Sequence, residues 1–174
     1  MPYFDIALLL IIFGFGVVGW RFGLVHALGS LAGTILGVYL ASRWYAPVAD
    51  WIINTTHWSS NFSRVVVFII VFLIINRVVG IAFFLINKAL SIITRLPIIH
   101  GINKLLGFGF GIIEGVLVVG IILYFVNKFP LDARFMNQAA QSKIAPYCVQ
   151  AASILWPFIP EAIRLIKDHT GLTL

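Results

Sequence analysis

The amino-acid sequence predicts an all-α integral membrane protein with four transmembrane helices. Of its 174 residues, 61% are apolar and 10% are charged, whereas a soluble domain has roughly 45–50% apolar and about 25% charged residues. The sequence also contains four apolar stretches, each of about 20 residues, the length that crosses a bilayer as a helix. The alternation of apolar and polar residues that marks a membrane β-barrel is missing. This composition argues against a water-soluble enzyme domain and against a disordered chain.

The first two predicted spans form a helical hairpin. They cover residues 3–20 and 24–42, and the second contains no Asp, Glu, Lys or Arg. Residues 21–23 alone separate them, so we expect a short, tight turn that does not re-enter the membrane. Asp5 opens the first span, where a carboxylate complements the positive end of the helix dipole.

The third and fourth spans cover residues 65–86 and 105–126. At a rise of ~1.5 Å per residue, both reach across the ~30 Å hydrocarbon core. The loop predicted between spans two and three, residues 44–63, carries Trp44, Tyr45, Trp51 and Trp58. Such aromatic rings favour the headgroup zone, so we interpret these four as an interfacial belt rather than as an aromatic ligand cage. The second loop, residues 87–104, contains Pro97, which stops a helix.

The net charge of +6 does not indicate a nucleic-acid partner. The basic residues stand mostly at the ends of the apolar stretches, as they do in membrane proteins generally, and they form no run. The sequence contains no catalytic motif, no cofactor-binding motif and no pair of metal ligands at the usual spacing. We therefore expect no enzyme activity, no cofactor and no metal, and we interpret the single Cys148 as a small apolar filler.

The sequence divides into a transmembrane domain, residues 1–126, and a C-terminal tail, residues 127–174. Near the end of the tail, Pro160 followed by Glu161 is favourable for a helix start. We expect a short amphipathic helix near residues 160–168, which lies either on the membrane surface or on the protein's own helices. The distribution of basic residues favours cytoplasmic short loops and extracytoplasmic termini.

Glycines recur at four-residue spacing in two of the predicted spans. The two runs are Gly29, Gly33 and Gly37 in the second span and Gly107, Gly111 and Gly115 in the fourth. Each run lies on one helix face, where another backbone can approach closely. We expect these faces to pack span two against span four; an interface between copies of the chain is the other interpretation, and the two are not exclusive. The first span has the less regular glycines Gly14, Gly16 and Gly19, which predict close packing against span two.

Arg77 and Glu114 are charged residues near the middle of spans three and four, where an unpaired charge costs several kcal/mol. Arg77 is nine residues from Ile86, and Glu114 is nine residues from Leu105, so antiparallel helices place them at similar depth. We expect an intramembrane ion pair, with Asn76 assisting. The pair serves either as a specificity device within the bundle or as one element of a proton or ion path. The other polar residues available to such a path are His26, Ser30 and Thr34.

Two segments resemble the colicin V production (CvpA) family. The first contains Asp5, the turn Arg21-Phe22-Gly23 and the run Ser30-Leu31-Ala32-Gly33. The second begins with Asn103-Lys104-Leu105-Leu106-Gly107 and continues to Glu114-Gly115. The resemblance covers about residues 1–126. The chain departs from the family pattern at Phe22, Ala27 and Glu114, where the family usually has an arginine, an acid and a basic residue.

The resemblance implies a small protein of the bacterial inner (cytoplasmic) membrane, linked to toxin production or export and to envelope maintenance. The glycine runs and the lack of catalytic residues favour a non-enzymatic membrane scaffold. In the lipid bilayer, such a scaffold packs with itself as a homo-oligomer or with a membrane or secretion partner protein. The alternative is a subunit of a small oligomeric channel, or of a proton- or ion-coupled transporter, that uses Arg77 and Glu114.

Overall fold

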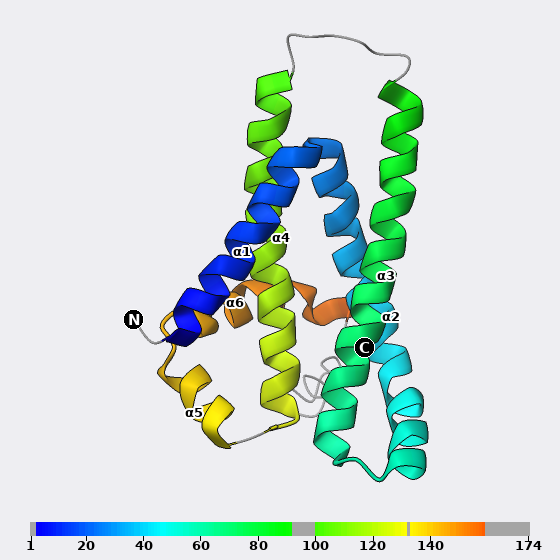
Figure 1. The fold of residues 1–174 in the computed structure, drawn as a ribbon, viewed down its shortest axis with the longest axis vertical. Helices are drawn as coiled ribbons and strands as arrows, with labels where there is room; N and C mark the ends of the chain where they lie inside the picture. The colour runs from blue at the N-terminus through cyan, green and yellow to red at the C-terminus, as the bar shows by residue number, and fades with distance from the viewer. Residues whose placement is uncertain (1–2, 92–99, 132, 159–174) are drawn as a thin grey trace, which may run out of the picture.

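The structure, a computed structural model, describes residues 3–91, 100–131 and 133–158, and these residues form helices joined by short connections (Figure 1). The elements are α1 (Tyr3–Phe22), α2 (Leu24–Thr56), α3 (Ser60–Ser91), α4 (His100–Lys128), α5 (Ala133–Gln141), α6 (Ala145–Ala152) and the 3₁₀ helix η2 (Ser153–Phe158). Four helices, α1 to α4, are long and apolar enough to cross a membrane. The predicted all-α fold with four spans is confirmed.

The connection between α2 and α3 is much shorter than predicted. Residues 44–63 were expected as a loop, but α2 continues through Pro47 to Thr56, and only residues 57–59 are non-helical. A proline inside a helix removes one backbone hydrogen bond, and burial of apolar residues beyond it favours the helix. Tyr45, expected at the membrane interface, is 3% exposed and lies in the core. The three tryptophans of this region remain exposed, namely Trp44, Trp51 and Trp58.

The helices pair as α2 with α3 and α1 with α4, whereas the backbones of α3 and α4 come close at few points. Spans three and four, between which the sequence predicts an ion pair, therefore meet mainly through buried side chains of the core. In Figure 1, α3 and α4 diverge towards the ends that lie beyond the α1–α2 turn. The greater part of the loop that joins them, residues 92–99 with Pro97, lies outside the described residues.

The glycines of α2 pack against α3. A Cβ atom at Gly33 would lie 3.1 Å from the carbonyl oxygen of Asn76, and one at Gly37 would lie 3.0 Å from the Phe72 ring. Gly29 contacts Phe83 in the same way. The run thus serves internal packing, but its partner is α3 and not α4 as predicted.

The glycines of α4 pack against α1. A Cβ atom at Gly107 would lie 2.7 Å from the backbone carbon of Gly23, and one at Gly111 would lie 3.0 Å from that of Phe15. Gly115 contacts Ile12 of α1. The glycines of α1 that were expected to face α2, Gly16 and Gly19, also face α4. A run of small residues marks a face for close approach, and the geometry here selects a different partner for each run.

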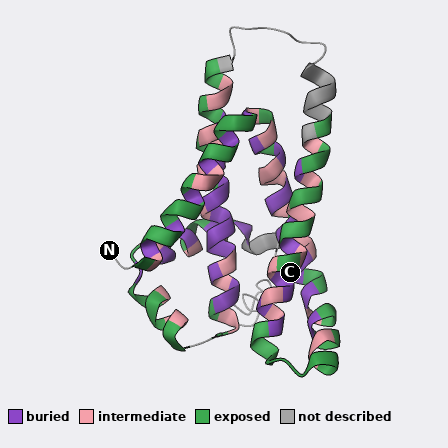
Figure 2. Cartoon of the chain, viewed as in Figure 1, coloured by how far each residue is buried: buried purple, intermediate pink, exposed green. Residues whose placement is uncertain are grey.

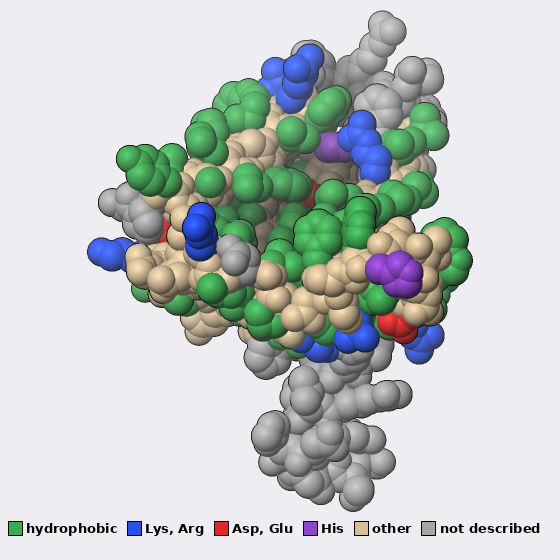
Figure 3. All heavy atoms as spheres, turned by 60° about the horizontal axis from the view of Figure 1, so that its bottom comes forward, with side chains coloured by type: hydrophobic (Ala, Val, Ile, Leu, Met, Phe, Trp, Pro, Cys, Tyr) green, Lys and Arg blue, Asp and Glu red, His purple; other side chains and the backbone are tan. Residues whose placement is uncertain are grey.

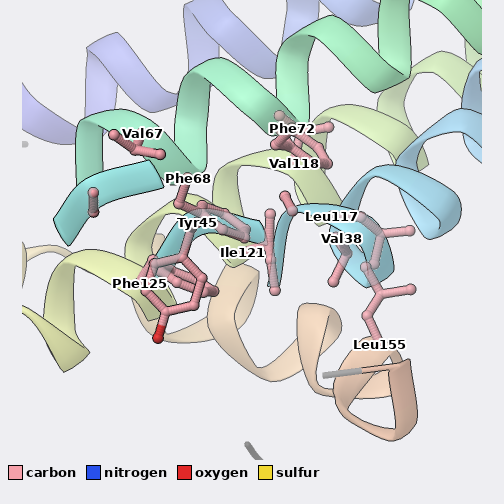
Figure 4. Packing of buried hydrophobic residues seen from close by; sticks show 12 residues of the cluster. Val38, Tyr45, Val67, Phe68, Phe72, Leu117, Val118, Ile121, Phe125 and Leu155 are labelled. Carbon is pink, nitrogen blue, oxygen red and sulfur yellow. The ribbon is translucent and has the colours of Figure 1, made fainter. Parts of the chain in front are cut away.

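An aromatic cluster fills the space where α2, α3 and α4 meet (Figure 4), and Figure 2 shows buried residues on the same three helices. Phe68, Phe72 and Phe125 are fully buried. The Phe68 ring stacks on Phe72 and on Phe125, with interplanar angles of 7° and 9°. Tyr45 meets Phe125 edge-on with a centroid distance of 5.3 Å. This cluster ties the two helix pairs together.

The segment after α4 folds back onto it. α6 packs closely against Gly120 of α4 through the backbone of Cys148 and the Ala152 side chain. Cys148 is 1% exposed, and this burial raises the pKa of its thiol. The structure therefore places α6 in the same packed body as the spans, although it follows the domain limit predicted at residue 126. The amphipathic helix expected near 160–168 lies outside the described residues.

Asp5 joins the start of α1 to the start of α6. Its carboxylate accepts a hydrogen bond from the Ser142 hydroxyl and one of 3.3 Å from the Lys143 backbone N–H. The Ser142 oxygen in turn accepts the backbone N–H groups of Ile144, at 3.2 Å, and Ala145, at 2.9 Å. Asp5 thus has a packing partner far along the chain, beyond the helix-dipole role predicted from the sequence.

Replacing Ser142 by alanine should loosen the segment that follows α4. The change removes the link to Asp5 and leaves two N–H groups at the start of α6 without their acceptor, and loss of such an acceptor at a helix start costs about 1 kcal/mol. We expect several-fold faster proteolysis within α5 and α6, measured on the purified protein in detergent. An unchanged cleavage rate would show that Ser142 does not hold this segment.

Candidate functional site

Asn103 closes the turn between α1 and α2. Gly23 has φ +85° and ψ −180°, a conformation that is essentially restricted to glycine. The Asn103 side chain contacts Gly23, and its Oδ1 accepts the Leu24 backbone N–H at 3.0 Å. Two residues of the family-like segments, far apart in the sequence, therefore meet at this turn. Near them, Arg21 is exposed and Lys104 is half-buried.

A cavity of about 840 Å³ lies between the α1–α2 hairpin, α3 and α4. Most of its wall is apolar, and its polar or charged side chains are His26, Ser30, Asn76, Arg77 and Glu114. Figure 3 shows a hollow in the molecular surface with an acidic side chain inside it and histidine and basic side chains near its edge. Ligand pockets are typically apolar clefts of ≈ 300–1,000 Å³ with a few placed polar groups, and this cavity has both properties.

Glu114 forms the polar floor of the cavity. Its side chain is 3% exposed, and its Oε1 accepts a hydrogen bond of 2.5 Å from the Ser30 hydroxyl of α2. Asn76 of α3 also bonds to this carboxyl group, and its amide donates to the Thr34 hydroxyl at 2.8 Å. The carboxyl group is thus bonded to helices on two sides, and the polar residues noted in the sequence form one network.

Arg77 lines the same cavity but is not the ion-pair partner of Glu114. Within the described ranges, the salt bridge that forms joins Arg64 to Asp50 at 3.7 Å. Glu114 instead accepts the Ser30 hydroxyl of α2, and its partner on α3 is Asn76, the residue before Arg77. Arg77 itself is exposed. The sequence brought the right two residues to one site but assigned them the wrong contact.

His26 lies at the end of the cavity nearest the α1–α2 turn. Its ring contacts Phe22 with a centroid distance of 4.8 Å. Its Nδ1 is buried and, in the described part of the chain, has no hydrogen-bond partner. A buried polar atom without a partner calls for a water or a ligand group, so this end of the cavity is suited to hold one.

The cavity ends against the aromatic cluster and opens sideways. Phe72 and Val118 line it and also belong to the buried core. α1 and α3 make no extensive contact, and the lining residues on these two helices include six exposed apolar side chains: Ile11, Val18, Phe22, Leu73, Ile81 and Leu85. This side of the cavity, the mouth between α1 and α3, is therefore bordered by exposed apolar side chains, which would face hydrocarbon where these helices cross a bilayer.

Two glycines widen this cavity because they carry no side chain. Gly80 of α3 is buried, yet a Cβ atom there would meet nothing within 4 Å, and the same holds for Gly14 of α1. Sequence reasoning missed the cavity because no residue pattern encodes an empty volume between helices. Gly80 could have been noted as a glycine in mid-span without a four-residue partner. As for metals, no three His, Cys, Asp or Glu side chains in the described ranges are grouped to hold an ion.

The sequence matches the family described as "Colicin V production protein" over residues 4–153. It is also 25% identical over 174 residues to the "Uncharacterized transmembrane protein YshB" of Bacillus subtilis (strain 168), with 87% of this chain and 96% of that protein covered. No solved structure is significantly similar. The match reaches beyond the fourth span and includes α6, which packs on α4. The chain, a multi-pass membrane protein, belongs to the colicin V production protein family.

Proposed function

We propose that the protein is a non-enzymatic accessory protein of the bacterial inner membrane that supports toxin production and secretion or envelope maintenance. The observation that carries this proposal is the cavity, which is open on one side and closed against the aromatic cluster. Such a shape suits binding and holding better than passage. The glycine runs no longer support a homo-oligomer, because both are used within the chain. A membrane or secretion partner is the interpretation that remains.

Filling the cavity tests this proposal. Gly80→Leu adds a side chain to a buried position with open space, so it should fill the cavity without disturbing the bundle. Gly109→Leu is the matched control, because a Cβ atom there also meets nothing within 4 Å but Gly109 is exposed and does not line the cavity. Both variants should fold and reach the membrane in amounts similar to those of the original protein.

The measurement is the amount of toxin secreted by a producing strain that lacks its own family member. The original chain and Gly109→Leu should restore secretion, whereas Gly80→Leu should reduce it at least tenfold. Full secretion with Gly80→Leu would contradict the proposal that the cavity is the working part.

A transporter subunit is the second candidate, favoured by Arg77 and Glu114 lining one cavity near mid-span. In that case the aromatic cluster that contains Phe72 must open during the transport cycle. Glu114→Gln, which keeps a hydrogen-bond acceptor for Ser30, would abolish a pH-dependent flux in proteoliposomes without unfolding the protein. If no flux exists with either glutamate or glutamine, the accessory role stands and the transporter role does not.

A further inference from the structure

Arg77 carries a charge in the middle of the membrane span without an ionic partner in the described part of the chain. It lies thirteen residues after Arg64 in α3, about 20 Å along the helix, within a hydrocarbon core of ~30 Å. The acidic side chains that the structure describes are engaged elsewhere: Asp5 with Ser142, Asp50 with Arg64 and Glu114 with Ser30. A charge at this depth almost always pairs or faces water.

Arg77 and Glu114 line the same cavity at different distances from its mouth. Glu114 is 3% exposed, on the floor and hydrogen-bonded from two sides, whereas Arg77 is exposed on the wall formed by α3. A group that arrives through the mouth between α1 and α3 therefore meets the guanidinium before the carboxylate. Charge complementarity at the mouth favours an anionic group.

The depth of Arg77 decides what can carry that anion. The headgroup of an anionic lipid stays at the membrane interface, with about 10 Å of hydrocarbon between it and Arg77. A transmembrane helix, in contrast, can present a carboxylate at any depth. The mouth is also long enough to receive a helix. Its apolar side chains on α1 extend from Ile11 to Phe22, a distance of about 17 Å or three helical turns. Gly14 and Gly80 leave space for close approach.

We infer that the mouth between α1 and α3 receives a transmembrane helix of a partner protein that carries an acidic residue near its midpoint, which pairs with Arg77. This inference rests on the proposed accessory function and names the class of partner. Arg77 gives specificity, because a partner helix without the acid leaves the guanidinium unpaired in hydrocarbon.

A designed peptide tests the pairing directly. The full-length protein is reconstituted in phosphatidylcholine vesicles with a labelled 24-residue Leu/Ala helix that carries one Asp at its centre, and association is measured by energy transfer. A peptide with Asn at the same position is the matched control. Because the acid is central, either orientation of the peptide places it within about 5 Å of the depth of Arg77, inside the reach of the arginine side chain. We expect at least tenfold stronger association of the Asp peptide than of the Asn peptide.

Three variants complete the experiment. Arg77→Met should abolish the preference for Asp while leaving the thermal unfolding midpoint unchanged, and Gly80→Leu should prevent binding of both peptides. Arg77→Glu should prefer a peptide with a central Lys. A preference for Asp that survives in Arg77→Met, or equal binding of the Asp and Asn peptides, would overturn the inference. Binding of dodecyl phosphate in place of the peptides would also overturn it and would assign the mouth to a lipid. These outcomes would contradict the helix-docking inference only. The proposed function is tested separately, by toxin secretion with the Gly80→Leu variant.

Discussion

Alanine at Gly111 should destabilise the bundle, whereas alanine at Gly109 should not. A Cβ atom at Gly111 would lie 3.0 Å from the backbone carbon of Phe15 and 3.1 Å from the Cα of Gly16. Backbone atoms cannot rotate away, so α1 and α4 must separate along this face, and such overpacking costs about 1–3 kcal/mol. Alanine at Gly107 should act in the same way, because its Cβ would lie 2.9 Å from the Cα of Gly23.

Gly109 provides the control in the same helix. A Cβ atom there meets nothing within 4 Å, and a glycine-to-alanine change without strain stabilises a protein by about 0.4–1 kcal/mol. The measurement is the thermal unfolding midpoint of each variant in the same detergent. Equal midpoints for the variants at 109 and 111 would mean that α4 does not pack on α1 through this face.

Glu114→Leu should lower the free energy of unfolding strongly, and Arg77→Met should change it little. Leucine removes the acceptor of the Ser30 hydroxyl and a partner of Asn76, and each buried polar group left without a partner costs about 1–3 kcal/mol. Glu114→Gln retains an acceptor and should lose much less. Arg77 is exposed and forms no salt bridge in the described ranges, so methionine there removes no ionic contact and should not lower the free energy of unfolding.

The double variant Arg77→Met/Glu114→Leu distinguishes two side chains that do not pair with each other from a direct Arg77–Glu114 ion pair. If Arg77 and Glu114 were paired, removing either one would cost about 3–5 kcal/mol and removing both would restore much of the loss. We expect instead that the effects of Arg77→Met and Glu114→Leu add to within about 0.5 kcal/mol. A coupling energy of several kcal/mol between the two substitutions would show that Arg77 and Glu114 do form the ion pair predicted from the sequence.

The four spans could be predicted because hydropathy and length act locally along the chain. The predicted end of α2 was wrong for a physical reason: Pro47 and the neighbouring tryptophans are typical of a loop at the membrane interface, yet Tyr45 and Ala49 gain burial by continuing the helix. Local signals for a helix end are weaker than the apolar contacts that a few more turns make available.

The pairing of the helices could not be predicted from the glycine runs. Four-residue spacing defines a face for close approach on one helix but does not identify the helix that approaches. Arg77 and Glu114 were found because charges in mid-span are rare, and the depth estimate correctly brought them to one site. Their contact depended on Ser30 of α2, a residue on a third helix, and on the divergence of α3 from α4.

A cavity with a polar floor at Glu114 lies inside the bundle beside Gly80. Gly80→Cys in a Cys148→Ala background tests it most directly, with a small membrane-permeant maleimide applied to the protein in lipid vesicles. Gly33→Cys is the matched control, since its Cβ atom would lie 3.1 Å from the Asn76 carbonyl oxygen. We expect ready modification of Gly80→Cys and none of Gly33→Cys. Equal lack of reaction at both positions would show that no such cavity exists in the membrane.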